Sequence, residues 1–253
     1  MSPDPTIEIL PDAAALALRA LELFRAAARS SIRGQGRFTV ALAGGATPRR
    51  LYEALADRDS DEPLPWERIH LFWGDERDVG PDDPGSNYRM AREALIDRIA
   101  IPEQNVHRIP AGEGSARDAA AGCERELRAF FGRGDGRIPS LDLVLLGLGE
   151  DGHTASLFPG SPLLADTERL VTSGRVEMLA AERISMTLRL INGAARVIFL
   201  VSGASKAQAA KRILEGAGSG ELLPAARVAP AGGSLTWLLD AAAAADLEEI
   251  REG

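Results

Sequence analysis

Short apolar runs alternate with longer amphipathic stretches along almost the whole chain. The runs at 38–43, 141–146 and 197–201 are largely apolar and lack regular polar alternation, which is typical of strands buried on both faces of a parallel sheet. The stretches between them carry apolar residues at helical spacing. The pattern predicts an α/β, Rossmann-like fold, with a mostly parallel sheet, helices on both faces and right-handed crossovers.

Capping and turn residues predict where individual elements begin and end. Helices are predicted after four N-caps: Asp12 (to about Gly34), Thr47 with Pro48 in the first turn, Ser86 (through Ile99) and Ser115. Further predicted elements are strands at 7–10, 69–73 and 106–109, a helix at 205–214, and loops at 75–85, 147–162 and 215–220. We find neither a long linker nor a repeat of 20 to 50 residues, so we expect a single domain over residues 1–253.

Composition and charge narrow the range of functions. The chain has 253 residues, of which 45% are hydrophobic and 26% charged, as in ordinary globular proteins. The net charge of −8 argues against broad binding to nucleic acid or to an anionic membrane, because both need a basic footprint. A few clustered cations could still bind one phosphate.

Three features favour a cytoplasmic protein. The start of the sequence lacks the basic and apolar regions of a signal peptide, and no apolar stretch approaches the roughly 20 residues of a membrane span. The single cysteine, Cys123, cannot form an internal disulfide. We expect a monomer or a weak homodimer without nucleic-acid or membrane partners.

Four predicted strands end in polar or glycine-rich segments. These are AGGATP (43–48), GDER (74–77), GLGEDGHT (147–154) and SGASK (202–206). Ligands of open parallel sheets bind beyond the carboxyl ends of the strands. The convergence of four such ends therefore predicts one shared site.

Two of the strand ends suggest a phosphate site. The turn Gly44-Gly45-Ala46-Thr47 could offer backbone N–H groups at a helix N-terminus, although an ordinary tight turn explains the same residues equally well. It is not a Walker loop, because the GK[ST] ending is missing. Lys206 could supply a charge from the neighbouring strand end, although a lone lysine is usually solvated.

Two arginines are further candidates. Arg77 directly follows a buried strand and could bind a carboxylate, carbonyl or phosphate oxygen as a fork. The alternative for Arg77 is an ion pair with Asp75, Glu76 or Asp78. Arg183 is a further candidate for phosphate binding.

The segment GLGEDG formally matches the dinucleotide fingerprint GxGxxG. The fingerprint requires a helix directly after the glycines, whereas HTASLFPGSP, with Pro159 and Gly160, follows here. We therefore do not expect a dinucleotide cofactor.

Of the three histidines, His153 is the natural acid–base candidate, because it lies among glycines at a strand end with Asp151 two residues earlier. His70, within the apolar run IHLFW, and His107, near a predicted strand, are expected to be structural. One cysteine and no second histidine nearby make a zinc site unlikely, and no GxSxG elbow of a serine esterase is present. A hydrolase using activated water, or an isomerase using proton transfer, remains.

These segments resemble those of the 6-phosphogluconolactonase family. The likeness is carried by LDLVLLGLGEDGHTASLFPGSP, IHLFWGDERDVGPDDPGSNYRMA and AGGATPRRLYEAL, and by ERISMTLRLINGA, VIFLVSGASKAQA and PAARVAPAGGSLTWLLDAAAA nearer the carboxyl end. It covers roughly residues 10 to 245. The chain departs from the family at Ala43 and Ala46, where hydroxyl residues are often found.

The resemblance implies a fold shared with glucosamine-6-phosphate deaminases and hydrolysis of 6-phospho-D-glucono-1,5-lactone without metal or cofactor. His153 would activate water, Asp151 would orient His153, and Arg77 or backbone N–H groups would stabilise the oxyanion. The alternatives are an isomerase or deaminase acting on an amino-sugar phosphate, or a non-catalytic sugar-phosphate sensor. Against the deaminase, no glutamate follows His153 shortly in HTASLFPG.

Overall fold

A six-stranded parallel sheet forms the centre of the computed structural model, which describes residues 4–57, 63–132, 137–216 and 223–248. Its strands, in spatial order, are β1 (Thr6–Leu10), β9 (Ser234–Asp240), β8 (Arg196–Val201), β5 (Leu143–Leu146), β2 (Phe38–Leu42) and β3 (Ile69–Trp73). The predicted α/β fold class is confirmed. The apolar runs became the central strands because every residue of β2 and β5 is buried.

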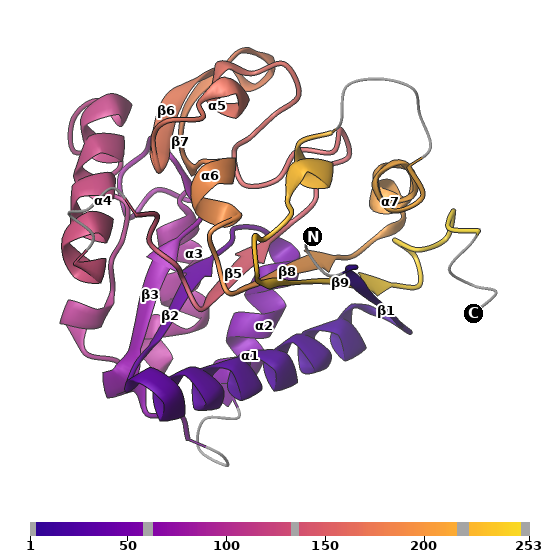
Figure 1. Ribbon diagram of the computed structural model, residues 1–253, viewed down its shortest axis with the longest axis horizontal. Coiled ribbons are helices and arrows are strands. Elements are labelled where there is room, and N and C mark those ends of the chain that lie inside the picture. Colours follow the sequence, from indigo (N-terminus) through magenta and orange to yellow (C-terminus); the bar gives the residue numbers. More distant parts are fainter. Residues whose placement is uncertain (1–3, 58–62, 133–136, 217–222, 249–253) are drawn as a thin grey trace.

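Helices lie on both sides of this sheet. They are α1 (Ala13–Gln35), α2 (Ala46–Asp57), α3 (Asn87–Ala94), α4 (Ala116–Phe131), α5 (Pro162–Ala165), α6 (Leu188–Ile191) and α7 (Ala207–Leu214). In Figure 1, α1 and α2 run below the sheet, whereas α6 and α7 lie above it. The core between these layers includes Cys123, which is buried on α4. None of the described helices is long and apolar enough to cross a membrane.

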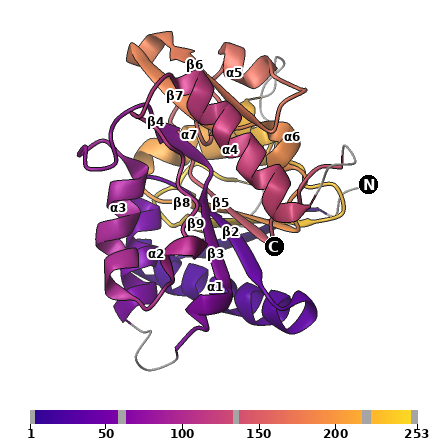
Figure 2. The same ribbon diagram turned by 90° about the vertical axis from the view of Figure 1, so that its left-hand side faces the viewer.

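A second, antiparallel sheet corrects the sequence-based expectation of a plain loop at 75–85. Its three strands, in the order β4 (Asp75–Arg77), β7 (Ala181–Met186) and β6 (Val171–Val176), lie beside α4 at the top of Figure 2. Its strands β6 and β7 were not predicted. The main-chain N–H of Met186 donates to the carbonyl of Gly74 (2.8 Å), which joins this small sheet to the end of β3.

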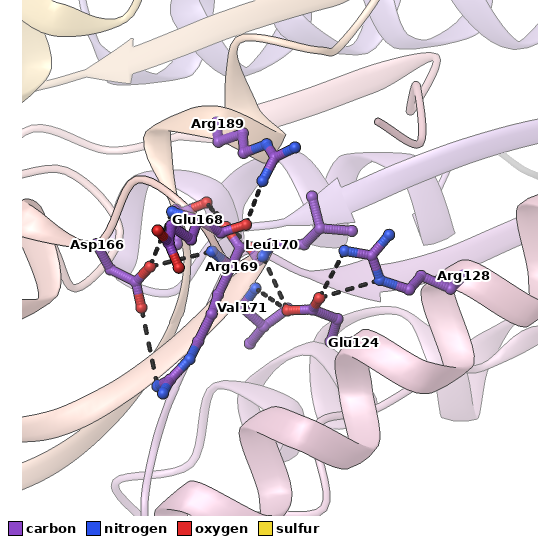
Figure 3. A network of polar contacts seen from close by, with 9 residues as sticks. Glu124, Arg128, Asp166, Glu168, Arg169, Leu170, Val171 and Arg189 are labelled. Carbon is purple, nitrogen blue, oxygen red and sulfur yellow. Dashed lines mark hydrogen bonds and ion pairs between the residues drawn. The ribbon is translucent and has the colours of Figure 1, made fainter. Parts of the chain in front are cut away.

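One carboxylate fastens α4 to the small sheet. Glu124 accepts hydrogen bonds from the main-chain N–H groups of Leu170 (2.8 Å) and Val171 (3.3 Å), and from the guanidinium of Arg128 (2.8 Å) (Figure 3). These hydrogen bonds lower the pKa of Glu124 although its partial burial acts in the opposite direction. The helix and the edge of β6 are thereby held in a fixed relation.

Helix capping follows the sequence at three of the four predicted N-termini. Asp12 accepts from the N–H groups of Ala14 and Ala15, Ser86 caps α3 and Ser115 caps α4. The fourth prediction was wrong: Thr47 lies inside α2, which begins at Ala46. The helical hydrogen bonds begin at Gly45, whose carbonyl accepts from the N–H of Arg49 (3.1 Å) and whose φ of 102° lies outside the helical range.

Three other boundaries differ from expectation. Helix α3 ends at Ala94 and is followed by a 3₁₀ turn, so it does not continue through Ile99. The predicted strand at 106–109 is reduced to a single bridge between Val106 and Leu71. The helix expected from Ser205 begins at Ala207 after a 3₁₀ turn that contains Lys206, and residues 217–220 of the predicted loop at 215–220 lie outside the described residues.

Candidate active site

A cavity of about 210 Å³ opens at the carboxyl ends of β2, β3 and β5. Residues from three of the four predicted strand ends line it: Gly44 and Gly45, Gly74, Asp75 and Arg77, and Gly147 and His153. Further lining residues are Ala43, Asn87, Leu145, Leu146, Leu148 and Ala155. Three of the four strand ends thus meet as predicted, whereas no residue of the fourth, SGASK (202–206), lines the cavity.

The imidazole of His153 is paired with a carboxylate. Its Nδ1 lies 2.6 Å from Oδ1 of Asp151, and the same oxygen accepts from the main-chain N–H of His153 (3.1 Å). Both side chains are 31% exposed. Among the described residues Nε2 has no hydrogen-bond partner. The pair thus presents one free ring nitrogen at a solvent-accessible cavity, which is the arrangement of a general base held by an orienting carboxylate.

The loop that carries His153 contains no dinucleotide-binding helix. After β5 the chain forms a tight turn, in which the N–H of Gly149 donates to the carbonyl of His153 (2.8 Å). The next helix, α5, begins only at Pro162. The helix that the GxGxxG fingerprint requires directly after its glycines is therefore not formed in this loop, and the absence of a dinucleotide cofactor stays a prediction.

The geometry of the turn after β2 explains why both of its residues 44 and 45 are glycine. A side chain at Gly44 would overlap the amide of Asn87, and Gly45 has a φ of 102°. Tyr52 of α2 returns to the strand end, where its hydroxyl donates to the carbonyl of Ala43 (2.8 Å) and accepts from its N–H (2.9 Å). The start of α2 is thereby fixed beside the cavity.

Arg77 reaches the cavity from β4. Its guanidinium donates to the carbonyl of Gly85, and it forms no ion pair within the described part of the chain, so the alternative of a pair with a neighbouring acid is not seen. Glu76 points the other way and accepts from the N–H groups of Asn87 (2.7 Å) and Tyr88 (2.8 Å). Burial raises the pKa of Glu76 despite these hydrogen bonds. Glu76 therefore serves to dock α3 on β4.

Two polar residues of the cavity wall were not predicted as site residues. Asp75, a buried carboxylate, accepts from the hydroxyl of Ser156 (2.6 Å), and the amide of Asn87 donates to its carbonyl (3.0 Å). Asp75 entered the sequence analysis only as a partner for Arg77. Asn87 lies next to a predicted N-cap, and only the fold of β4 against α3 brings it to the glycine turn.

Five predicted site residues are not among the residues that line the cavity. Asp151 is connected to it through His153. Ala46 and Thr47 occupy the first turn of α2. Lys206 lies 3.7 Å from Glu150, which belongs to the loop of His153. Arg183 is the register partner of Arg77 across β4 and β7; partial burial, and then the charge of Arg77, lowers its pKa.

The other two histidines lie away from this cavity. Nδ1 of His70 is 3.2 Å from Nε2 of His107, and Nδ1 of His107 is 2.6 Å from Oε1 of Glu126. In the described ranges no group of three or more His, Cys, Asp or Glu side chains gathers in a way that could hold a metal ion. The absence of a metal from the reaction stays a prediction.

Comparison with known proteins identifies the family of the chain. Residues 11–237 match a family model described as glucosamine-6-phosphate isomerases/6-phosphogluconolactonase. The chain belongs to this family. A 6-phosphogluconolactonase of Nostoc sp. is 46% identical over 242 residues, covering 96% of this chain and 98% of the relative.

Solved structures of the family agree with this result. The 6-phosphogluconolactonase of Trypanosoma brucei superposes with a TM-score of 0.87 at 29% identity, covering 97% of this chain and 99% of that one. A monomeric glucosamine-6-phosphate deaminase shares the fold, with a TM-score of 0.78 at 22% identity and coverage of 95% and 99%. One fold thus carries both a lactonase and a deaminase.

Proposed function

We propose that this chain hydrolyses 6-phospho-D-glucono-1,5-lactone to 6-phospho-D-gluconate, a step of the oxidative pentose phosphate pathway. The observation that carries the proposal is the His153–Asp151 pair, which presents a free Nε2 to a cavity lined by Arg77 and the turn at Gly44 and Gly45. The near full-length likeness to 6-phosphogluconolactonases supports the same reaction.

His153 acts as a general base in this proposal. Its Nε2 takes a proton from a water molecule while the water oxygen bonds to the lactone carbonyl carbon. The protonated imidazole then gives this proton to the ring oxygen of the lactone, as the bond between the carbonyl carbon and that oxygen breaks. Asp151, 2.6 Å from Nδ1, orients the imidazole and stabilises its charged form between the two steps.

In the transition state the carbonyl oxygen gains negative charge, which a hydrogen-bond donor must stabilise. Arg77 is the cation that lines the cavity, and its other N–H groups remain after one is given to Gly85. Fixed donors aimed at a developing oxyanion are often the largest single contribution to catalysis. We assign this role to Arg77.

The substrate phosphate is assigned to the start of α2. The N–H groups at Ala46 and Thr47 belong to the first turn of that helix, where the dipole favours an anion, and Gly44 and Gly45 permit close approach. Lys206 approaches the catalytic loop through Glu150 and supplies the charge. Arg183 could contribute from β7, behind Arg77. Ala43 and Ala46 offer no hydroxyl, so backbone N–H groups carry more of the binding.

A deaminase or isomerase is the second candidate, because the buried carboxylate of Asp75 also lines the cavity and could move a proton. That carboxylate is already engaged by the hydroxyl of Ser156 (2.6 Å) and lies 3.3 Å from the amide of Asn87. No second acid follows His153 in its loop. The lactonase is therefore the better-supported reaction.

The test uses both substrates. The protein is mixed with freshly made 6-phosphogluconolactone, and acid release is followed against the spontaneous rate; in parallel, ammonia release from glucosamine 6-phosphate is measured. We expect saturable acid release far above the spontaneous rate and no ammonia. Ammonia release without lactone opening would favour the deaminase, and binding of both compounds without turnover would favour a sensor.

A further inference from the structure

The imidazole of His153 is contacted on several sides, not only by Asp151. The ring of Phe158 stacks on it, with centroids 4.0 Å apart and planes inclined by 28°. A methyl group added at Gly149 would overlap Nδ1 and Cε1 of His153, so the backbone of Gly149 closely approaches that edge of the ring. One face and one edge of the imidazole are therefore covered, and Nε2 lies at the uncovered end.

Phe158 is itself held firmly. It is 5% exposed and lies directly after Leu157, whose N–H donates to the carbonyl of Thr154 (2.9 Å). Ser156, which lies between Thr154 and Leu157, donates a hydrogen bond from its hydroxyl to the carboxylate of Asp75 (2.6 Å). A buried aromatic ring on an anchored loop loses little freedom when it contacts the imidazole, so it can serve as a fixed support.

The backbone between the two rings is unusual. Ala155 has a φ of 47°, a left-handed conformation that residues with a side chain rarely adopt. Gly152, just before His153, has a φ of 84°. A left-handed conformation at Ala155 persists only where surrounding contacts impose it, and it lies in the turn between His153 and Phe158, whose rings stack.

We infer that Phe158 is a positioning residue for the lactone hydrolysis proposed above: its ring holds the imidazole of His153 with Nε2 toward the cavity and stabilises the positive charge that the imidazole gains. An aromatic face attracts a cation, whereas an aliphatic side chain of similar bulk fills the space without that attraction. Gly149 permits the same placement, because it puts no side chain against the Nδ1–Cε1 edge of the imidazole. The inference rests on the proposed function.

The charged groups around the imidazole are few. Asp151 faces it from its own loop, Asp75 and Arg77 line the same cavity from β4, and the pair of Lys206 with Glu150 lies at the loop's outer side. A substitution at Phe158 replaces none of these charged residues. A change in pH dependence that appears in Phe158→Leu and not in Phe158→Tyr can therefore be attributed to the aromatic contact.

The test replaces Phe158 by Leu and by Tyr. Phe158→Leu should lower kcat by about threefold to tenfold, between the scales of an exposed and a desolvated cation–aromatic contact because His153 is 31% exposed, while KM changes less than about twofold. The acid limb of kcat against pH should move to lower pH, because the protonated ring has lost stabilisation. Phe158→Tyr keeps the aromatic face and should restore both the rate and the profile.

Phe72→Leu is the matched control, because Phe72 stacks on His107 in the same way, with centroids 4.4 Å apart and planes inclined by 7°. That substitution should lower the Tm and leave kcat and the pH profile unchanged. Unchanged kcat and pH profile in Phe158→Leu would overturn the inference, as would a loss that Tyr does not restore. Failure of the unmodified protein to open the lactone would instead overturn the proposed function.

Discussion

The molecule holds two histidine–carboxylate pairs of nearly the same geometry. Nδ1 lies 2.6 Å from a carboxylate oxygen both in His153 with Asp151 and in His107 with Glu126. Each imidazole also stacks on a phenylalanine ring. The pairs differ at the opposite ring nitrogen: Nε2 of His107 contacts His70 at 3.2 Å, whereas Nε2 of His153 has no partner among the described residues.

The difference follows from the position of each histidine along the chain. His70 lies within β3, and His107 is bound to that strand through its N–H, which donates to the carbonyl of Leu71 (2.8 Å). Both ring nitrogens of His107, and Nδ1 of His70, contact partners within the protein. His153 lies beyond the end of β5, where the sheet opens into the cavity. A paired histidine therefore becomes a candidate base only where its second nitrogen faces a site.

The strongest way to break this comparison is to remove each imidazole in turn. His153→Ala should lower kcat for 6-phosphogluconolactone by roughly 10²–10⁴-fold, the usual contribution of positioned acid–base catalysis. His107→Ala should leave kcat within a few-fold and lower the Tm. Asp151→Asn should reduce kcat less than His153→Ala does, because the imidazole remains. Equal losses in His153→Ala and His107→Ala would mean that the two pairs do not differ as described.

A substitution at Lys206 should affect phosphate binding and leave the chemistry of His153 unchanged. Lys206→Ala should weaken binding of the phosphorylated lactone by about 1.5–3 kcal/mol, the scale for hydrogen bonds to charged groups. Hydrolysis of unphosphorylated gluconolactone should scarcely change, since it has no phosphate to lose. Steady-state KM values for the two lactones provide the measurement. A parallel loss on both would point to a structural lesion, and no loss on either would remove Lys206 from the site.

The contact between His70 and His107 should make the free energy of unfolding depend on pH. Burial lowers the pKa of His70 from 6.5 to about 4, and His107 and Arg37 act in the same direction. Between these values the unfolded chain binds a proton that the folded chain refuses, so stability falls as pH drops from 6.5 to 4. Because His70 is only half-buried, we expect a loss of about 1.5 kcal/mol, well below the full conversion of the shift.

Urea unfolding of the wild type and of His70→Gln at pH 7 and pH 4.5 measures this loss. The variant should lose less stability than the wild type over that interval, because glutamine does not titrate. A variant that loses the same amount would show that His70 is not the group responsible. Lactone hydrolysis by His70→Gln at pH 7 should remain near the wild-type rate.

The smallest expected effect is that of chelation. Neither histidine pair is joined by enough further ligands in the described ranges to hold a metal ion, and the water-activation scheme uses none. Exhaustive treatment with a chelator should therefore leave the rate of lactone hydrolysis unchanged. Loss of activity that one divalent ion restores would mean that a metal, and not His153 alone, activates the water.

Local sequence signals predicted much of the fold. The apolar runs became β2, β3, β5 and β8, and Asp12 and Ser115 begin helices as their side chains suggest. The polar strand β4 was missed because it forms by pairing with β7, which is distant in sequence and was itself not predicted. The start of α2 was misplaced because nothing in the sequence distinguishes a positive φ at Gly45 from one at Gly44.

The candidate site was predictable where its contacts are local. His153 and Asp151 are two residues apart, so their pairing is a property of one loop. Asn87 was not predictable, because its place beside Gly44 depends on how α3 docks against β4. The stacking of Phe158 on His153 was missed for a different reason: it requires the left-handed turn between them.

In the proposed reaction His153 supplies the chemistry, and other residues bind the phosphorylated substrate. Calorimetry can measure the dissociation constant of the product 6-phosphogluconate for the His153→Ala protein and so separate the two roles. We predict a value within about threefold of the wild type, because Lys206, Arg77 and the start of α2 are intact; loss of one weak contact costs well under 1.4 kcal/mol, or less than tenfold. A dissociation constant raised by 10² or more, as steeply as the rate falls, would contradict the account.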